Sequence, residues 1–93
     1  MPSGGIEEMN LDFQIKSGKV LLDFYAPWCA PCKQLDPLLE RVPLKVIKIN
    51  VDEHPEIAGQ YDVRGLPTVI VMEDGVEAVR FTGNKVAERL RDL

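Results

Sequence analysis

The hydrophobic positions at the start of the chain follow two different spacings. Ile6, Met9 and Phe13 recur at intervals of three and four residues. This spacing places them on one helical face, so it predicts a short helix over about residues 7–16. Residues 20–25 then form a nearly continuous apolar run that is rich in Val, Phe and Tyr. A run of this length and composition predicts a strand that is buried on both faces.

The apolar positions that follow the first cysteine return to a helical spacing. Leu35, Leu39 and Val42 recur at i, i+4 and i+7, which is typical of an amphipathic helix. Pro37 lies inside this segment and predicts a kink, because proline removes one backbone donor and its ring crowds the preceding turn. Pro43 predicts the end of the helix.

The second half of the chain predicts three more strands and two more helices. These are a strand over residues 45–51, a short helix over residues 54–61, strands over residues 68–73 and 76–82, and a last helix that carries Val86, Leu90 and Leu93. Helices between consecutive strands predict parallel neighbours, whereas the Asp74-Gly75 signal between the last two strands predicts an antiparallel hairpin. We therefore expect an α/β fold in which a mixed sheet has helices on both faces.

Length and charge narrow the range of partners. The 93 residues allow one domain, which we expect to span residues 1–93 with a flexible segment at residues 1–5. The net charge is -4 and the basic residues are scattered, so a nucleic-acid partner is not expected. No apolar run approaches the length of a membrane span, and the N-terminus lacks the pattern of a secretory signal. These features predict a cytoplasmic protein with no membrane partner.

The two cysteines, Cys29 and Cys32, lie three positions apart, and His54 is the single histidine. A structural zinc site needs four ligands, so we expect no bound metal. A purely structural crosslink is the alternative to a redox role. Closing so short a loop stabilises a chain by only about 2 kcal/mol, and a cytosolic setting would keep such a bond reduced. A C-x-x-C pair in a βαβ pattern therefore favours redox chemistry.

The position of the pair makes its two members unequal. Cys29 is expected where a buried strand turns into a helix, and the unpaired N–H groups and partial positive charge of a helix start stabilise a thiolate. Lys33 adds a nearby cation. Because the thiolate is the reactive form, Cys29 is predicted to attack and Cys32, one turn further on, to resolve the mixed disulfide.

Asp23 is the second anomaly, because it interrupts an apolar strand and a buried carboxylate is costly. Burial would raise its pKa, so that the group could accept the proton of Cys32, through water, as that thiol attacks. An exposed Asp on a strand edge explains the pattern equally well. Lys48 is similarly placed between apolar residues of the next strand. It could face Asp23 and moderate its charge, or reach the surface instead.

A longer pattern surrounds these residues. The segment LDFYAPWCAPCK at residues 22–33 closely resembles the active-site segment of the thioredoxin family, and the likeness extends in family order from Val20 to the C-terminus. Its further matches are Pro37, residues 48–52, residues 63–68, Gly75 and Gly83. The resemblance implies a thioredoxin fold with a four- or five-stranded sheet, and an activity that reduces protein disulfides.

The resemblance also implies roles for individual residues. Cys29, Cys32, Asp23 and Lys48 would be catalytic, with Lys48 tuning Asp23. A shallow substrate groove would be formed by Trp28, Ala30, Pro31, Leu66, Pro67 and Gly83. Proline belongs at a strand entrance, where an X–Pro bond is usually trans. The family has a cis bond here, so the resemblance implies a cis Leu66–Pro67 bond that brings the Leu66 backbone beside the cysteines.

The chain departs from the family in three places. Ala30 replaces the usual glycine, the active-site helix is about a turn shorter, and little room is left for the usual first strand. No catalytic residue is lost. The chain has no dinucleotide fingerprint, so we expect no bound cofactor. The resemblance implies electrons from NADPH through a flavin-containing thioredoxin reductase, disulfide-containing protein substrates and a monomer. Alternatives are a glutaredoxin-like reductase and a redox-independent binding subunit of a larger assembly.

Overall fold

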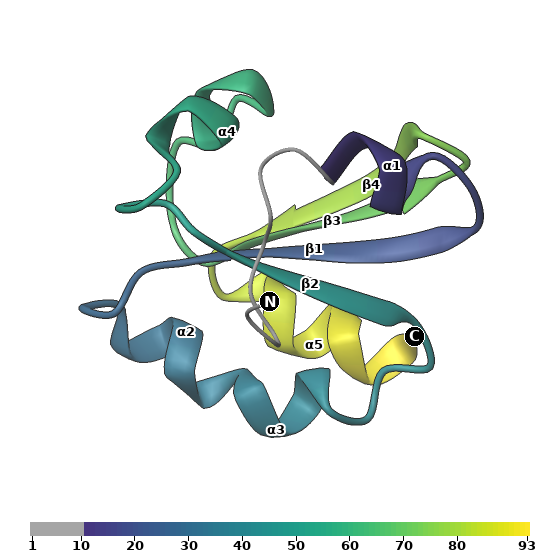
Figure 1. Ribbon diagram of the computed structural model, residues 1–93. Helices are drawn as coiled ribbons and strands as arrows, with labels where there is room; N and C mark the ends of the chain where they lie inside the picture. Colours follow the sequence, from purple (N-terminus) through teal and green to yellow (C-terminus); the bar gives the residue numbers. More distant parts are fainter. Residues whose placement is uncertain (1–10) are drawn as a thin grey trace.

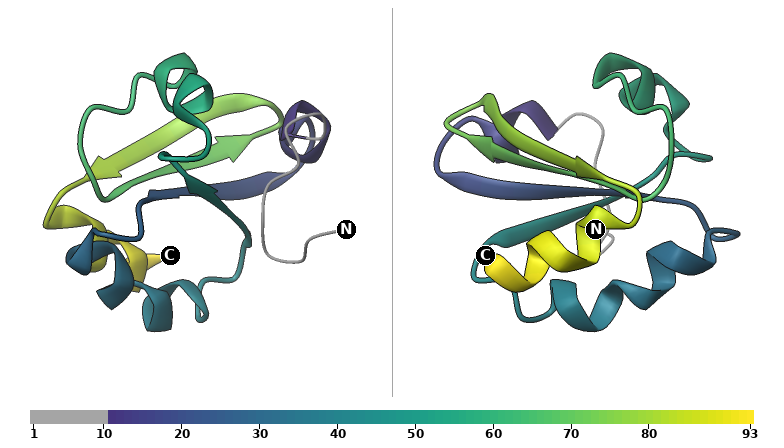
Figure 2. Two further views of the ribbon diagram at one scale, coloured as in Figure 1. Left: turned by 60° about the vertical axis from the view of Figure 1, so that its left-hand side comes forward. Right: turned by 180° about the vertical axis from the view of Figure 1, so that it is seen from behind.

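The computed structural model describes residues 11–93 as a sheet that separates two groups of helices (Figure 1). Helices α1 (Leu11–Ile15) and α4 (Pro55–Gln60) cover one face. Helices α2 (Ala30–Gln34), α3 (Asp36–Leu39) and α5 (Lys85–Asp92) cover the other. The two further views in Figure 2 show the same layers. The flexible segment predicted at residues 1–5, and the first residues of the predicted helix over 7–16, lie outside the described residues.

The sheet within residues 11–93 has four strands in the order β2-β1-β3-β4. Their bounds are β1 Lys19–Tyr25, β2 Lys45–Asn50, β3 Thr68–Glu73 and β4 Val76–Thr82. Strand β1 pairs with β2 in parallel and with β3 in antiparallel, and β3 pairs with β4 in antiparallel. Asp74 and Gly75 join β3 to β4 with φ angles of 52° and 85°, the left-handed pair that a two-residue hairpin needs. The predicted mixed sheet with helices on both faces is confirmed.

The helix predicted after Cys29 is divided into α2 and α3, and the division lies at Leu35. The Leu35 N–H donates to the Cys32 carbonyl at 3.1 Å, and the Leu35 carbonyl accepts from Leu39 N–H at 2.9 Å. Pro37 has no N–H to continue the ladder from α2 into α3. The predicted kink is therefore confirmed, in the stronger form of two short helices.

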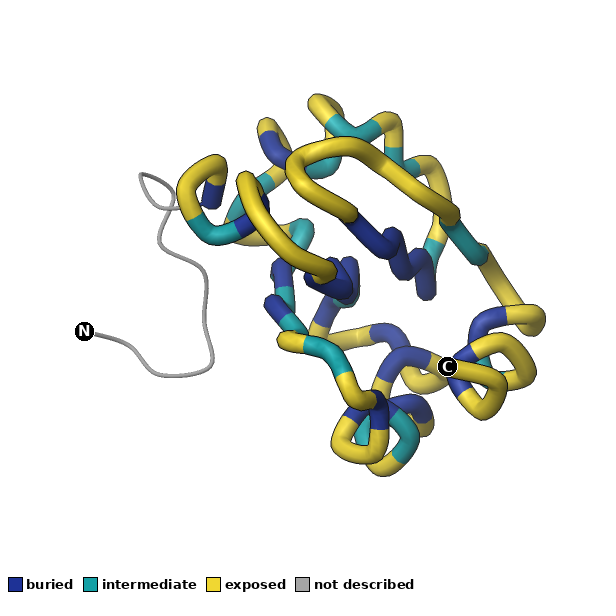
Figure 3. Tube along the Cα trace, turned by 90° about the vertical axis from the view of Figure 1, so that its right-hand side faces the viewer, coloured by how far each residue is buried: buried dark blue, intermediate teal, exposed yellow. Residues whose placement is uncertain are grey.

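Each face of the sheet carries its own apolar core, because successive residues of β1 point to opposite faces. Val20, Leu22 and Phe24 belong to the core under α1 and α4, together with residues such as Ile47, Ile49 and Ile57. Leu21 belongs to the core under α2, α3 and α5, together with Leu35, Leu39, Val42, Val69, Val71, Val86 and Leu90. Figure 3 shows that these buried stretches lie inside a largely exposed outer surface. By the same alternation, the Asp23 side chain lies on the face that carries Leu21, under α2, α3 and α5.

Candidate active site

Cys29 and Cys32 form a disulfide at the point where the chain leaves β1 and enters α2, with their Cα atoms 5.3 Å apart. Cys29 is the N-cap residue of α2, and its sulfur accepts a hydrogen bond from the Cys32 N–H at 3.2 Å. The strand-to-helix placement expected from the sequence is confirmed. Cys29 is 4% exposed and Cys32 is 5% exposed, so their surroundings, and not their burial, distinguish them.

Asp23 is buried, with 1% of its surface exposed. It lies in the middle of β1, between Lys48 of β2 and Val69 of β3 in the strand register. Its Oδ1 atom has no hydrogen-bond partner among residues 11–93. Burial raises the pKa of Asp23 from its usual 3.8 to about 6, although the positive charge of Lys48 lowers it. The exposed-edge interpretation of this residue is therefore wrong.

Lys48 lies opposite Asp23 in the register but forms its ion pair with another residue. Its Nζ atom donates to Asp36 Oδ1 at 2.8 Å, and the ammonium lies 5.5 Å from the centre of the Tyr25 ring. This hydrogen bond raises the pKa of Lys48. The sequence interpretation missed Asp36. The signal that could have found it is spacing, because Asp36 follows Cys32 by four residues and such pairs share one face of a helix.

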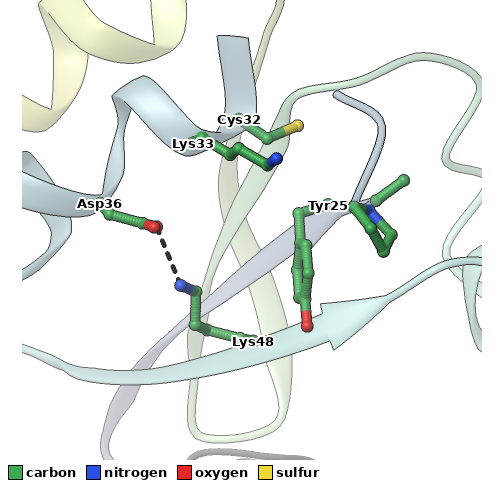
Figure 4. Close-up of a pocket in the computed structure, with 7 residues that line it drawn as sticks. Tyr25, Cys32, Lys33, Asp36 and Lys48 are labelled. Carbon is green, nitrogen blue, oxygen red and sulfur yellow. Dashed lines mark hydrogen bonds and ion pairs between the residues drawn. The ribbon is translucent and has the colours of Figure 1, made fainter. Parts of the chain in front are cut away.

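A cavity of about 190 Å³ lies beside the ion pair of Lys48 and Asp36 (Figure 4). Cys32, Asp36 and Lys48 all line it. The rest of its wall consists of Tyr25, Ala26, Pro27 and Lys33. Cys29 is not part of this wall, although both cysteines belong with Ala26 to a small buried cluster against which Val51 and Leu66 pack. The cavity therefore gives Cys32, and not Cys29, a polar surrounding with room for water.

Five of the six residues predicted to bind substrate line two grooves. Trp28 and Leu66 line a groove of about 230 Å³ with Val51, Ala58, Val63, Arg64 and Gly65. Trp28 is 69% exposed, and its indole N–H donates to Asp52 Oδ2 at 3.0 Å. An exposed indole beside an apolar groove is a surface on which a peptide segment can dock.

The other three of these residues line a second groove. Pro31, Pro67 and Gly83 line a groove of about 320 Å³ between α2 and α5. The Leu66–Pro67 bond is cis, as the family resemblance implies and contrary to the usual trans bond. The Gly83 N–H donates to the Pro67 carbonyl at 2.9 Å. Ala30 lines neither groove and is exposed at the start of α2, between the two cysteines in the sequence.

Within residues 11–93, no group of three or more His, Cys, Asp or Glu side chains is placed to hold a metal ion. Over the same range, no helix has the length and apolar character needed to cross a membrane.

Comparisons with known proteins agree with one another. The family model described as Thioredoxin matches residues 6–93. A thioredoxin of Bacillus subtilis is 40% identical over 92 residues, which cover 92% of this chain and 88% of that protein. A mutant thioredoxin from Halobacterium salinarum has a TM-score of 0.82 at 35% identity, covering 95% of this chain and 82% of that one. The oxidised mitochondrial thioredoxin 3 of Saccharomyces cerevisiae has a TM-score of 0.78 at 32% identity, covering 92% and 90%.

Proposed function

The chain belongs to the thioredoxin family and is a protein-disulfide reductase with a Cys29–Cys32 redox pair, and from this premise we propose a role for each residue around the pair. The observation that carries the proposal is the asymmetric setting of the disulfide. Cys32 lines a cavity together with Lys48 and Asp36, whereas Cys29 caps a helix start beside the substrate grooves.

The proposed reaction begins from the reduced dithiol. The Cys29 thiolate attacks one sulfur of a substrate disulfide, which breaks the substrate S–S bond, forms a mixed disulfide with Cys29 and releases one substrate thiolate. Cys32 then loses its proton and attacks the Cys29 sulfur. This step forms the Cys29–Cys32 bond and releases the second substrate thiolate. Two electrons pass from the cysteine pair to the substrate, and the released thiolates take up protons.

Asp23 is the proposed acceptor of the Cys32 proton. Its pKa of about 6 keeps it ionised at neutral pH, yet makes it a stronger base than an exposed carboxylate. Water in the cavity is the proposed path for the proton. Lys48 is proposed to tune the base, because its positive charge lowers the pKa of Asp23.

The substrate is proposed to bind in the grooves on either side of the disulfide. Trp28 and Leu66 would contact one part of an extended substrate segment, and Pro31, Pro67 and Gly83 would contact the other. Ala30, exposed between them, would lie against the substrate cysteine. The apolar residues that line these grooves suit contact with many protein substrates.

Reduction of insulin by dithiothreitol, followed as turbidity, tests the assignment of the cysteines. The wild type should accelerate the reaction, and Cys29→Ser should abolish the acceleration. Cys32→Ser should still attack but should accumulate a mixed disulfide, which mass spectrometry detects as an adduct on Cys29. If Cys29→Ser formed this adduct through Cys32, the two roles would be reversed. Absence of any dithiol-dependent turnover by the wild type would favour a redox-independent binding subunit.

The proposed source of electrons is NADPH, delivered by a thioredoxin reductase. The support is family membership and the disulfide state of the pair, which needs a reductant before each cycle. A coupled assay with NADPH, reductase and insulin should show NADPH oxidation that depends on this protein. Failure with the reductase and success with glutathione would instead indicate a glutaredoxin-like route.

We also propose that the protein is a monomer and that it works in the cytoplasm, where reduced thiols keep the cysteine pair active.

A further inference from the structure

The Lys48 ammonium acts on two carboxylates, because it binds Asp36 in an ion pair and its charge also lowers the pKa of Asp23. We infer that Asp36 is a positioning residue: by binding the ammonium of Lys48, it limits how far Lys48 can neutralise the buried carboxylate of Asp23, and so preserves Asp23 as a proton acceptor for Cys32. The inference rests on the catalytic role proposed for Asp23. It adds a residue on a different element, at the start of α3.

Asp23 and Asp36 are both possible partners for the Lys48 ammonium, and it is Asp36 that binds it. Lys48 is paired with Asp23 in the register of β1 and β2, so both side chains are on the same face of the sheet. Asp23 Oδ1 is buried without a hydrogen-bond partner among residues 11–93. Such a group would gain most from an ammonium neighbour. The Lys48 Nζ atom nevertheless lies 2.8 Å from Asp36 Oδ1.

The side chains of Lys48 and Asp36 are 37% and 47% exposed, and this difference from Asp23 explains the outcome. An ammonium that bound Asp23 directly would have to leave water almost completely, which carries a large desolvation cost. Asp36 offers a partner at the wall of the cavity, where Lys48 stays partly hydrated. Figure 4 shows the Asp36 and Lys48 side chains reaching toward each other from α3 and β2.

The charged groups that act on Asp23 come from two neighbouring elements, because strand β2 contributes Lys48 and helix α3 contributes Asp36. Lys33 and the disulfide-bonded Cys32 of α2 line the same cavity as this ion pair, and so does Tyr25 of β1. Strand β3 places the apolar Val69 opposite Asp23.

Among these neighbours, Lys48 lowers the pKa of Asp23 and Asp36 raises it. Removing the Asp36 charge should therefore lower the pKa of Asp23 for two reasons. The direct repulsion disappears, and Lys48 is free to approach Asp23. Both effects make Asp23 a weaker base.

A purely structural role for Asp36 is the competing explanation, because the pair also ties α3 to β2. Titration of Asp23 separates the two explanations. A structural role changes the free energy of unfolding but leaves the Asp23 titration in place. A positioning role moves that titration, and moves it through Lys48.

The first experiment measures the Asp23 side-chain carboxyl by NMR across a pH series, in the oxidised protein. The variants are Asp36→Asn, Lys48→Met, the double variant, and Glu40→Gln as the matched control. Glu40 is an exposed carboxylate that lies four residues after Asp36, at the end of α3, and has no ion pair with Lys48. Its removal changes the charge of the same helix without releasing Lys48.

The expected midpoint of Asp23 moves to lower pH in Asp36→Asn and to higher pH in Lys48→Met, and stays at the wild-type value in Glu40→Gln. The decisive comparison is the shift caused by Asp36→Asn with and without Lys48. We expect a smaller shift in the Lys48→Met background, because only the direct repulsion is then lost. An equal shift in both backgrounds, or no shift in either, would overturn the inference.

A kinetic experiment connects the titration to the reaction. The rate at which Cys32 resolves a preformed mixed disulfide is measured against pH in a single turnover. The acid limb of the wild type should move to lower pH in Asp36→Asn and stay in place in Glu40→Gln. Asp23→Asn serves as the check on the proposed function. If it leaves the acid limb unchanged, Asp23 is not the proton acceptor, whereas the NMR titration still decides whether Asp36 acts on Asp23.

Discussion

The two faces of the sheet differ in what they bury. Under α1 and α4, alternate residues of β1 are Val20, Leu22 and Phe24, and they meet an apolar core. Under α2, α3 and α5, the intervening residues are Leu21, Asp23 and Tyr25, and the carboxylate lies within reach of charged neighbours. A single strand therefore contributes only apolar side chains to one core, and a buried carboxylate beside an apolar core on the other face. The difference teaches that the period of two in a strand can separate stability from function within one segment.

The buried carboxylate on the second face decreases the stability of the fold when it is ionised. Phe24 and Asp23 are neighbours in sequence, at 0% and 1% exposure, yet burial has opposite consequences for them. Removing an aromatic ring from water stabilises the fold. Removing an ionised carboxylate from water destabilises it unless the group is protonated or fully paired. The charged face is therefore the one at which substitutions can increase stability.

Phe24→Ala is the largest expected effect, and it tests the apolar face. The ring is completely buried, and its centroid lies 5.9 Å from that of Tyr61. The loss of buried area and the resulting cavity should decrease the free energy of unfolding by about 3–5 kcal/mol, measured by urea denaturation. The NMR titration of Asp23 should be unchanged, because the substitution lies on the other face. A moved titration would show that the two faces are not independent.

Much of this fold could be predicted because local patterns and tertiary packing agree. The continuous apolar run of β1 predicts a strand that is buried on both faces, and the structure confirms it. Asp74-Gly75 correctly predicts the hairpin, and Pro37 correctly predicts the interruption of the helix. The pattern was less informative about helix ends. The amphipathic spacing continues to Val42, which is buried in the core, but α3 already ends at Leu39.

The residues of the candidate site could be recognised from the sequence, but the contacts between them could not. The cysteine pair and the anomalous Asp23 can be recognised from residue type and position alone. Which carboxylate binds Lys48 depends on where α3 lies over β2, and that is a tertiary relation. Asp36 at the first turn of a helix is an ordinary residue at that position, and its spacing of four residues from Cys32 indicates a shared helix face but not that it binds Lys48. For the same reason, the burial of Asp23 required the neighbouring strands to be placed.

Asp23→Asn is the next largest effect, and it tests the charged face. The pKa of Asp23 is raised from 3.8 to about 6, so the folded state binds this proton more tightly than the unfolded chain. Wild-type stability is then greatest below about pH 4 and decreases as pH rises through about pH 6. The difference in pKa corresponds to about 3 kcal/mol.

The neutral amide of the variant keeps a similar shape and cannot ionise. Its free energy of unfolding should exceed that of the wild type by about 3 kcal/mol near pH 8, and the two proteins should converge near pH 4. Urea denaturation at a series of pH values measures both curves. A constant difference at every pH would show that ionisation of Asp23 is not the source of the effect.

Lys48→Met is the smallest expected effect on stability, and it sharpens the comparison. The pair with Asp36 is partly exposed, at 37% and 47%, and such pairs contribute about 0–1 kcal/mol. Methionine keeps an unbranched stem, so we expect a loss below about 1 kcal/mol near neutral pH. The same substitution removes the charge that lowers the pKa of Asp23. The decrease of stability with pH should therefore extend to higher pH than in the wild type.

Lys45→Met is the matched control, because Lys45 lies on the same strand and pairs with Val20 in the register, on the opposite face from Lys48. It removes the same charge from the apolar face and should leave the pH dependence of unfolding in place. If both lysine variants moved that dependence equally, the effect would be one of net charge and not of position. If only Lys48→Met moves it, a residue that contributes little to stability controls the ionisation of the buried carboxylate, because it shares that carboxylate's face of the sheet.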